Sequence, residues 1–243
     1  FTLYNSGNIL NPKLESTLAP SGNYTLILRA TDSAGNDAGE ILNISVDNTY
    51  PSLTSINLSS SVISPINTDG YLDNLTITMT ASEFVDWGTL YIYNSTGDKV
   101  NRYTSFPNGI SNTRNWNGTY NGGYGNGYVP DGIYTINLTT TSNKALNDSA
   151  GNVNSSIFIG SIIVDNTIPT LSIPSATPIS SSSESITWTT NESTNSNVSY
   201  GTTILMTSNS GSTTFESSHS ISLSSLSAST FYYFNVTSCD AAG

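Results

Sequence analysis

The chain carries the same strand-ending sequence twice. Ser45-Val46-Asp47-Asn48-Thr49-Tyr50-Pro51 returns further along as Ile163-Val164-Asp165-Asn166-Thr167-Ile168-Pro169. Proline has no backbone amide hydrogen and holds the residue before it extended, so a strand that reaches this sequence stops pairing there. An exit used twice therefore predicts modules joined end to end.

A shorter motif precedes each exit. Asp32-Ser33-Ala34-Gly35-Asn36 recurs as Asp148-Ser149-Ala150-Gly151-Asn152, and Asp240-Ala241-Ala242-Gly243 begins it a third time. A hairpin turn with its glycine in the left-handed conformation explains this motif. We expect both ends of the sequence to lie within a longer polypeptide.

Composition narrows the class of protein. The 243 residues are enough for about two domains with cores of their own, and only 9% of them are charged. The net charge of −11 repels phosphate backbones, so we expect no nucleic-acid partner. The single cysteine, Cys239, closes no internal disulfide, and no apolar run is long enough to span a membrane.

Short alternating segments with β-branched and aromatic residues recur along the chain, separated by Gly, Asn, Asp, Ser and Pro. Examples are Tyr24–Thr31, Leu75–Ala81, Tyr134–Thr139 and Tyr232–Thr237. Strands at this spacing predict an all-β fold of tandem antiparallel β-sandwiches in an elongated array.

The exits set the predicted domain boundaries at 1–49, 50–167 and 168–243. Residues 1–49 hold three predicted strands, Phe1–Asn5, Tyr24–Thr31 and Ile41–Asp47, too few for a sandwich of about seven. Either upstream sequence or a strand from a neighbouring molecule completes this unit. Residues 50–167 are predicted to be a full domain, and 168–243 one that lacks its last strand.

The middle module resembles the Ig-like domain of the flagellar hook-capping protein and related bacterial secreted domains. The residues that carry this resemblance are Trp116-Asn117-Gly118, Gly127 and Val129-Pro130-Asp131-Gly132-Ile133-Tyr134, with Pro65 to Asp73 as the opening loop. In this pattern Asn-Gly and Asp-Gly form the turns, and the Trp and Tyr pack beneath them.

The last module resembles fibronectin type III domains, particularly those ahead of purple acid phosphatases and on archaeal and bacterial surface proteins. The matching segments are Ile186–Glu192, Val198–Thr202, His219–Leu223 and Leu226–Tyr232. The resemblance implies that Trp188 lies in the core and that Tyr232 hydrogen-bonds back to the backbone. Residues 1–49 resemble the C-terminal half of bacterial Ig-like repeats with Ala-Thr-Asp-x-Ala-Gly-Asn.

The loop of Asn67, Asp69, Tyr71 and Asp73 is the strongest candidate for calcium. It places side-chain and carbonyl oxygens at alternate positions around Gly70, as short calcium loops do. An ordinary Asx-turn before a strand explains the same residues.

The turn motifs are a weaker calcium candidate. Their side chains would bind an ion near a module junction, as in cadherin linkers, or they simply form the turn. The residues concerned are Asp32, Asn36, Asp47, Asp148, Asn152 and Asp165.

Asn-x-Ser/Thr sequons predict N-linked glycans, although the Asn and Ser/Thr content alone produces many of them. They begin at Asn23, Asn43, Asn57, Asn74, Asn94, Asn117, Asn137, Asn147, Asn154, Asn191, Asn197 and Asn235. Several alternate with apolar residues, which points the Asn outward on a strand; bare solvated sheets need the same pattern.

We expect no enzymatic activity, because His219 is the only histidine and falls on a predicted strand. The predicted function is that of an extracellular structural or adhesive segment of a cell-surface protein: a stalk, a surface (S-) layer or a filament subunit that assembles by strand complementation. Its partners would be neighbouring domains or like subunits. The lack of disulfides, low lysine content and dense sequons favour an archaeal glycoprotein.

Two alternatives stay open. A carbohydrate- or host-binding module would use the loop of Tyr120, Tyr124 and Tyr128 to stack against cell-surface glycans or proteins. A set of accessory domains of a larger secreted enzyme would need no site of its own.

Overall fold

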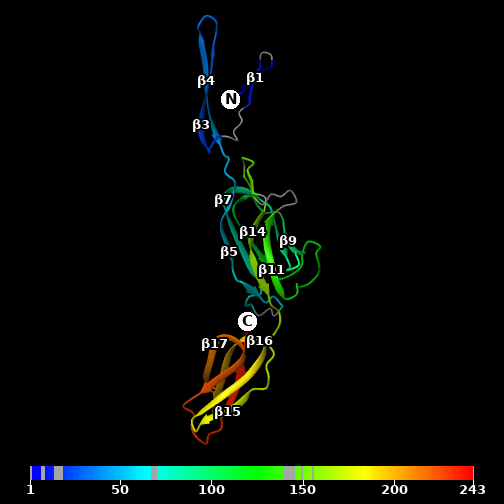
Figure 1. Ribbon diagram of the computed structural model, residues 1–243, viewed down its shortest axis with the longest axis vertical. Coiled ribbons are helices and arrows are strands. Elements are labelled where there is room, and N and C mark those ends of the chain that lie inside the picture. The colour runs from blue at the N-terminus through cyan, green and yellow to red at the C-terminus, as the bar shows by residue number, and fades with distance from the viewer. Residues whose placement is uncertain are drawn as a thin grey trace.

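The computed structural model describes residues 2–6, 9–13, 19–66, 70–104, 106–139, 146–148, 150–154 and 156–242, the first two ranges as backbone. Figure 1 shows three β-rich units that follow one another along the longest axis. Every strand pairing is antiparallel except one, and the described residues contain no helix. The predicted all-β fold is therefore confirmed. None of these residues forms an apolar helix of membrane-spanning length.

The N-terminal unit consists of two hairpins. β1 (Thr2–Ser6) pairs with β2 (Ile9–Lys13), and β3 (Gly22–Thr31) pairs with β4 (Asp37–Val46) along its whole length. β2 is not among the strands predicted from the sequence, and it contains Pro12, a residue type that sheets confine largely to edge strands. As an edge strand in a two-stranded hairpin it accommodates that proline.

The middle unit is a sandwich of two five-stranded sheets. One sheet contains β5 (Leu53–Leu58), β7 (Leu75–Trp87), β10 (Gly109–Trp116), β12 (Leu146–Asp148) and β13 (Val153–Asn154). The other contains β6 (Val62–Ile63), β8 (Thr89–Tyr93), β9 (Lys99–Tyr103), β11 (Gly132–Thr139) and β14 (Ser156–Val164). The pairing of β14 with β6 is the parallel one.

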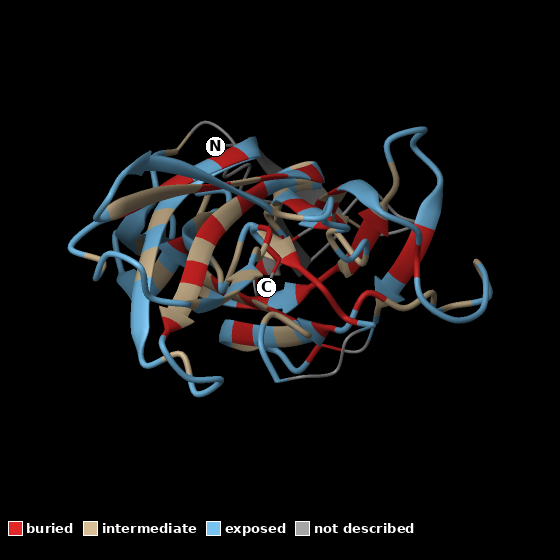
Figure 2. Cartoon of the chain, turned by 90° about the horizontal axis from the view of Figure 1, so that it is seen from below, coloured by how far each residue is buried: buried red, intermediate tan, exposed pale blue. Residues whose placement is uncertain are grey.

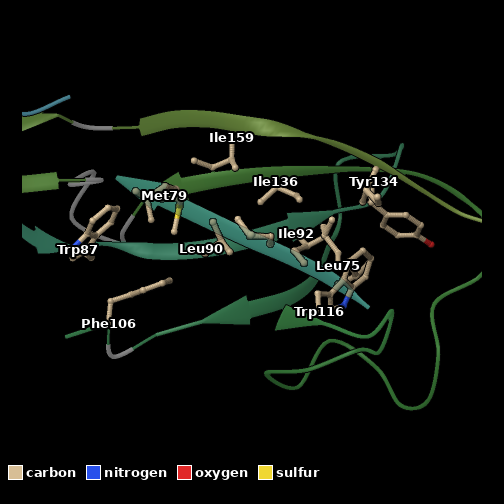
Figure 3. Packing of buried hydrophobic residues seen from close by; sticks show 14 of the residues in the cluster. Leu75, Met79, Trp87, Leu90, Ile92, Phe106, Trp116, Tyr134, Ile136 and Ile159 are labelled. Atoms are coloured by element: carbon tan, nitrogen blue, oxygen red, sulfur yellow. The ribbon is translucent and has the colours of Figure 1, made fainter. Parts of the chain in front are cut away.

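Alternate residues of these strands form the core between the sheets (Figure 3). Along β7, Leu75, Ile77 and Met79 are all fully buried, while the threonines between them are not. Trp116 and Tyr134 meet edge to face, 5.5 Å between ring centroids, and the Tyr134 hydroxyl donates to the Pro130 carbonyl at 2.6 Å. Burial raises the pKa of Tyr134 to about 12, so the hydroxyl stays a donor.

The last unit contains β15 (Ser175–Ser180), β16 (Ser183–Gly201), β17 (Ser208–Leu223) and β18 (Tyr233–Thr237). Its core is smaller and is made of Ile186, Trp188, Val198, Ile221 and Leu223. The implied role of Trp188 is confirmed, as is that of Tyr232, whose hydroxyl accepts a hydrogen bond from the Ser227 amide at 3.0 Å. Figure 2 shows buried residues alternating with half-buried or exposed ones along several strands.

Candidate cation sites at the module junctions

The first junction connects β4 to β5 and is held by hydrogen bonds from both sides. The Asn48 amide donates to Ser21 Oγ at 2.9 Å, which ties the linker to the N-terminal unit. From the middle unit, Asn152 Nδ2 donates to the Asp47 carbonyl at 3.0 Å. The linker is therefore bound to both units that it joins.

The second junction, from β14 to β15, repeats this arrangement with other residues. The Asn166 amide donates to Asp131 Oδ1 at 2.8 Å, where Asp131 takes the place of Ser21 between a proline and a glycine. The Thr170 amide then donates to Asn191 Oδ1 at 2.6 Å. At the first junction the Ser52 amide donates to Ser82 Oγ at 3.1 Å in the same way. The two linkers thus share one hydrogen-bonding scheme.

Each junction brings three carboxylates together. Within each group of three, one oxygen from every side chain lies within 4.8 Å of the others. The first cluster is Asp47, Glu83 and Asp148, and the second cluster is Asp165, Glu192 and Asp240. Both clusters consist of the aspartate of the strand exit, the aspartate of the turn motif and a glutamate from a long strand.

The local fold explains how each group reaches the junction. Asp148 and Asp240 open the turn motif, and Asp148 Oδ1 accepts the Asn152 amide at 2.9 Å, which fixes the side chain. Glu83 and Glu192 lie where long strands lose regular pairing. The register of β7 with β10 breaks between Thr80 and Val85, and that of β16 with β17 between Thr189 and Thr194. These irregular stretches turn the glutamates toward the linker.

In each cluster burial, and then the negative charges of neighbouring carboxylates, raise the pKa of the glutamate. Burial raises the pKa of Glu83, and the neighbouring charges of Asp148 and then Asp47 raise it further. Burial likewise raises the pKa of Glu192, followed by the charges of Asp165 and Asp240. Like charges that crowd together favour the protonated form, or a cation that neutralises them.

The donor set suits a hard divalent cation. All three side chains at each junction offer carboxylate oxygens, which calcium prefers, and no nitrogen or sulfur ligand belongs to either cluster. The first cluster draws Asp47 from the linker and the other two from the middle unit. An ion bound there would connect consecutive units.

The calcium loop predicted around Gly70 is only partly within the described residues. Asn67 and Asp69 lie outside them, and Tyr71 is exposed. Asp73 Oδ2 accepts a hydrogen bond at 3.0 Å from the amide of Gly70, three residues before it, which is not the downstream bond of an Asx-turn. Asp73 Oδ1 is buried without a hydrogen-bond partner among the described residues. Calcium at this loop stays a prediction.

The first copy of the turn motif joins no carboxylate cluster among the residues that the structure describes. Asp32 is bonded to Asn36 within the turn, through the backbone at 2.9 Å and the side chain at 2.7 Å, and these bonds lower the pKa of Asp32. Gly35 and Gly151 adopt φ of 89° and 91°, as predicted for the motif. Neither Asp32 nor Asn36 approaches Asp47, which lies at the other end of the ribbon.

The sequon asparagines lie at the surface wherever their side chains are described. Seven of them are exposed: Asn23, Asn43, Asn57, Asn74, Asn117, Asn191 and Asn235. Four are half-buried: Asn94, Asn137, Asn154 and Asn197. The side chain of Asn147 lies outside the described set. Some of these groups already have partners, such as Asn154 Nδ2, which donates to the Pro51 carbonyl at 3.3 Å.

The tyrosine loop of residues 120–128 folds back on the middle unit. Tyr120 packs against the core, and the Asn121 amide donates to the Val100 carbonyl at 3.1 Å. Tyr124 is half-buried, whereas Tyr128 is 42% exposed. Of the three, Tyr128 presents the most surface to a partner.

His219 is buried in the last unit and stacks on Trp188 at 4.9 Å between ring centroids. Its Nδ1 is 2.8 Å from Ser196 Oγ, and its Nε2 is 3.0 Å from Thr190 Oγ1. Both ring nitrogens thus contact hydroxyl groups. This geometry is that of a satisfied core histidine. Cys239 is half-buried and carries a free thiol.

Sequence reasoning missed Glu83, Glu192 and Asp240 as members of the clusters. A signal was present: Ile77-Thr-x-Thr-x-Ser-Glu83 recurs as Ile186-Thr-x-Thr-x-Asn-Glu192. The repeat places a glutamate at the same point of two equivalent strands. Asp240 belongs to the third copy of the turn motif, whose residues predict a turn but do not reveal the cluster.

No protein-family model and no curated protein matches the chain. Among solved structures, the FN1–FN3 domains of chicken CNTN1 are similar at 15% identity and a TM-score of 0.38, over 92% of this chain and 74% of that one. Dimeric latent PorU from Porphyromonas gingivalis is similar at 14% identity and a TM-score of 0.27, over 90% of this chain and 22% of that one. The fold class itself follows from the sheets described above.

Proposed function

We propose that the chain is a structural or adhesive segment of an extracellular, cell-surface protein, and that calcium at its module junctions makes the array rigid. The observation that carries this proposal is the duplicated junction cluster. Two linkers with one hydrogen-bonding scheme each gather two aspartates and a glutamate within 4.8 Å. Cation-bound joints at consecutive module boundaries would suit a stalk or filament, because they would limit bending between modules.

Calcium would act on the joints through charge. Three carboxylates held together repel one another, and this repulsion favours separation of the linker from the loops that carry the other acids. A bound divalent cation replaces the repulsion by attraction to each carboxylate. The joint then resists bending, and the units keep a fixed orientation.

The composition fits this role. The surface is polar through hydroxyls and amides, with 9% charged residues, and the chain has no internal disulfide to depend on. We propose N-linked glycans at the exposed sequons. We also propose that the middle unit is related to the hook-cap Ig-like domains and the last unit to the fibronectin type III domains found ahead of purple acid phosphatases. Assembly by strand complementation, as filament or surface layer, belongs to it as well.

The test is the shape of the chain in solution with calcium and with a chelator. Small-angle scattering should give a longer, narrower distribution of dimensions in calcium than in EGTA. The variants Glu83→Gln and Glu192→Gln should each weaken this response, because each removes one ligand from one joint. Glu40→Gln, an exposed change of equal charge in β4, is the control. Identical profiles in calcium and EGTA would contradict the proposal.

A further inference from the structure

The outer face of β8 and β9 in the middle unit carries two tyrosines and two cations. The two residues that flank Tyr91 in β8 are fully buried in the core, so Tyr91 and Tyr93 lie on the opposite face of the sheet. In the register of the two strands, Arg102 of β9 is opposite Tyr91, and Lys99 is opposite Tyr93. Cross-strand partners share a face of the sheet, so these four side chains are neighbours.

Both cations are held in place by neighbours that carry no negative charge. Lys99 Nζ lies 3.9 Å from the centre of the Tyr91 ring, which is a cation–π contact. Arg102 packs against Gly122, where an added Cβ would lie 2.8 Å from the arginine Cγ. Both cations are exposed, and neither pairs with a carboxylate in the part of the chain that the structure describes. Two positioned cations of this kind can bind an anion that comes from outside the chain.

The tyrosine loop adds a third ring to this face. The hydrogen bond from the Asn121 amide to the Val100 carbonyl holds the loop along β9. The rings of Tyr91 and Tyr93 are 6.0 Å apart between centroids. Burial raises the pKa of Tyr93, and the phenols of Tyr91 and then Tyr124 raise it further, which places Tyr124 close to the pair. Tyr93 and Tyr124 are half-buried, so each keeps ring surface in contact with solvent.

Rings beside cations suit a sugar that carries a carboxylate. The C–H groups of a sugar ring pack on the negative face of an aromatic ring, and the guanidinium of an arginine binds a carboxylate through two parallel hydrogen bonds. The chain has a net charge of −11 and only six Lys and Arg residues. The rest of its surface would therefore repel an extended polyanion such as nucleic acid or an anionic membrane. A single acidic sugar touches only this small face.

We propose that the face formed by Tyr91, Tyr93, Lys99, Arg102 and Tyr124 binds a uronic acid residue of a glycan. The sugar ring lies on Tyr93 and Tyr124. Its carboxylate is bound by Lys99 and Arg102. This binding function is additional to the structural role proposed above and does not depend on calcium at the junctions, so either one can fail alone.

The experiment titrates trigalacturonate into the chain in EGTA, followed by calorimetry, and we expect saturable binding at one site. Lys99→Gln and Arg102→Gln should each weaken binding at least about tenfold, because each removes a charge-assisted hydrogen bond. Arg102→Lys should restore only part of the affinity, since it keeps the charge but not the planar fork. Tyr124→Ala should weaken binding about threefold through the lost ring contact. Arg29→Gln, which removes an exposed charge from β3, is the control and should change nothing.

Two control ligands separate the contributions of ring and charge. Maltotriose lacks the carboxylates and citrate lacks the sugar rings, so each should bind at least about tenfold more weakly than trigalacturonate. Equal binding of either control ligand would overturn the proposal. So would the absence of saturable binding to the folded parent chain, or binding that the double variant Lys99→Gln/Arg102→Gln leaves unchanged. Light scattering is measured in parallel: dimers of the parent chain that this double variant abolishes would mean that the acids of a second copy occupy the face instead of a glycan.

Discussion

Gly118 shows how a single position limits the turn chemistry of the middle unit. Its φ is +68°, and a Cβ placed on it would lie 2.4 Å from Pro65 Cγ. Gly123, in the neighbouring loop, has φ of +85° but open space around it. Replacing Gly123 by alanine would therefore cost only the strained backbone conformation, whereas replacing Gly118 would add a clash with Pro65.

We predict that Gly118→Ala destabilises the middle unit far more than Gly123→Ala does. The left-handed conformation costs either alanine roughly 1–2 kcal/mol. At Gly118 the contact with the proline ring adds about 1–3 kcal/mol as an overpacked site. Denaturant unfolding followed by tryptophan fluorescence measures both variants. Equal losses would mean that Pro65 moves away freely.

The junction glutamates predict a dependence on pH. The pKa values of Glu83 and Glu192 are raised in the folded chain, so between the unfolded and the folded value the native state binds more protons. Without divalent cations, stability should fall as pH rises above 4.5, the ordinary pKa of glutamate, and through the raised pKa values of the folded chain. Thermal unfolding in EGTA across this range measures it, and the double variant Glu83→Gln/Glu192→Gln should flatten the decline. A decline that persists unchanged in the double variant would assign it to other groups.

Among the elements, β3 and β11 carry the same pattern with different surroundings. Both strands begin at the glycine of a Pro-x-Gly-x-Tyr motif. The Tyr24 hydroxyl donates to the Pro20 carbonyl at 2.7 Å, as the Tyr134 hydroxyl does to the Pro130 carbonyl. Leu138 of β11 is fully buried, whereas its equivalent in β3, Leu28, is 41% exposed. The ribbon β3–β4 is thus the counterpart of the antiparallel pair β11–β14, but no described strand covers its apolar face.

Because Leu138 is buried and Leu28 is exposed, we predict that replacing each by alanine lowers the free energy of unfolding by different amounts. Leu138→Ala should lower the free energy of unfolding by about 2–5 kcal/mol, the range for buried leucines. Leu28→Ala should cost under about 1 kcal/mol, since little transfer free energy is lost. Chemical denaturation of both variants provides the comparison. A large loss for Leu28→Ala would show that this face is covered in solution.

Local patterns in the sequence were sufficient to predict most strands. They were not sufficient to predict which residues from distant parts of the chain meet in the fold. Alternation placed the strands around Tyr24, Leu75 and Tyr134, because each core face is marked by every second residue. It did not reveal that Glu83 meets Asp47 and Asp148, since their meeting depends on a break in strand pairing and on the path of the linker. The packing of Tyr120 on the core likewise depends on the fold around it.

At the scale of the whole molecule, the units repeat their joints along with their strands. The strand exit, the glutamate and the turn motif recur in that order, so that both junctions have the same three acids. If calcium binds as proposed, rigidity would be set by the ions at these two joints in series. On this proposal, the array would extend when calcium is bound and loosen when calcium is removed.

The most direct measurement is the calcium stoichiometry of the chain by calorimetric titration at neutral pH. We predict that Glu83→Gln and Glu192→Gln each abolish a different one of two junction sites, and that the double variant loses both, while Glu40→Gln binds like the parent chain. Any additional site at Asp73 should persist in all of these variants. Binding that is unaltered in the double variant, or no calcium binding by the parent chain, would contradict the account.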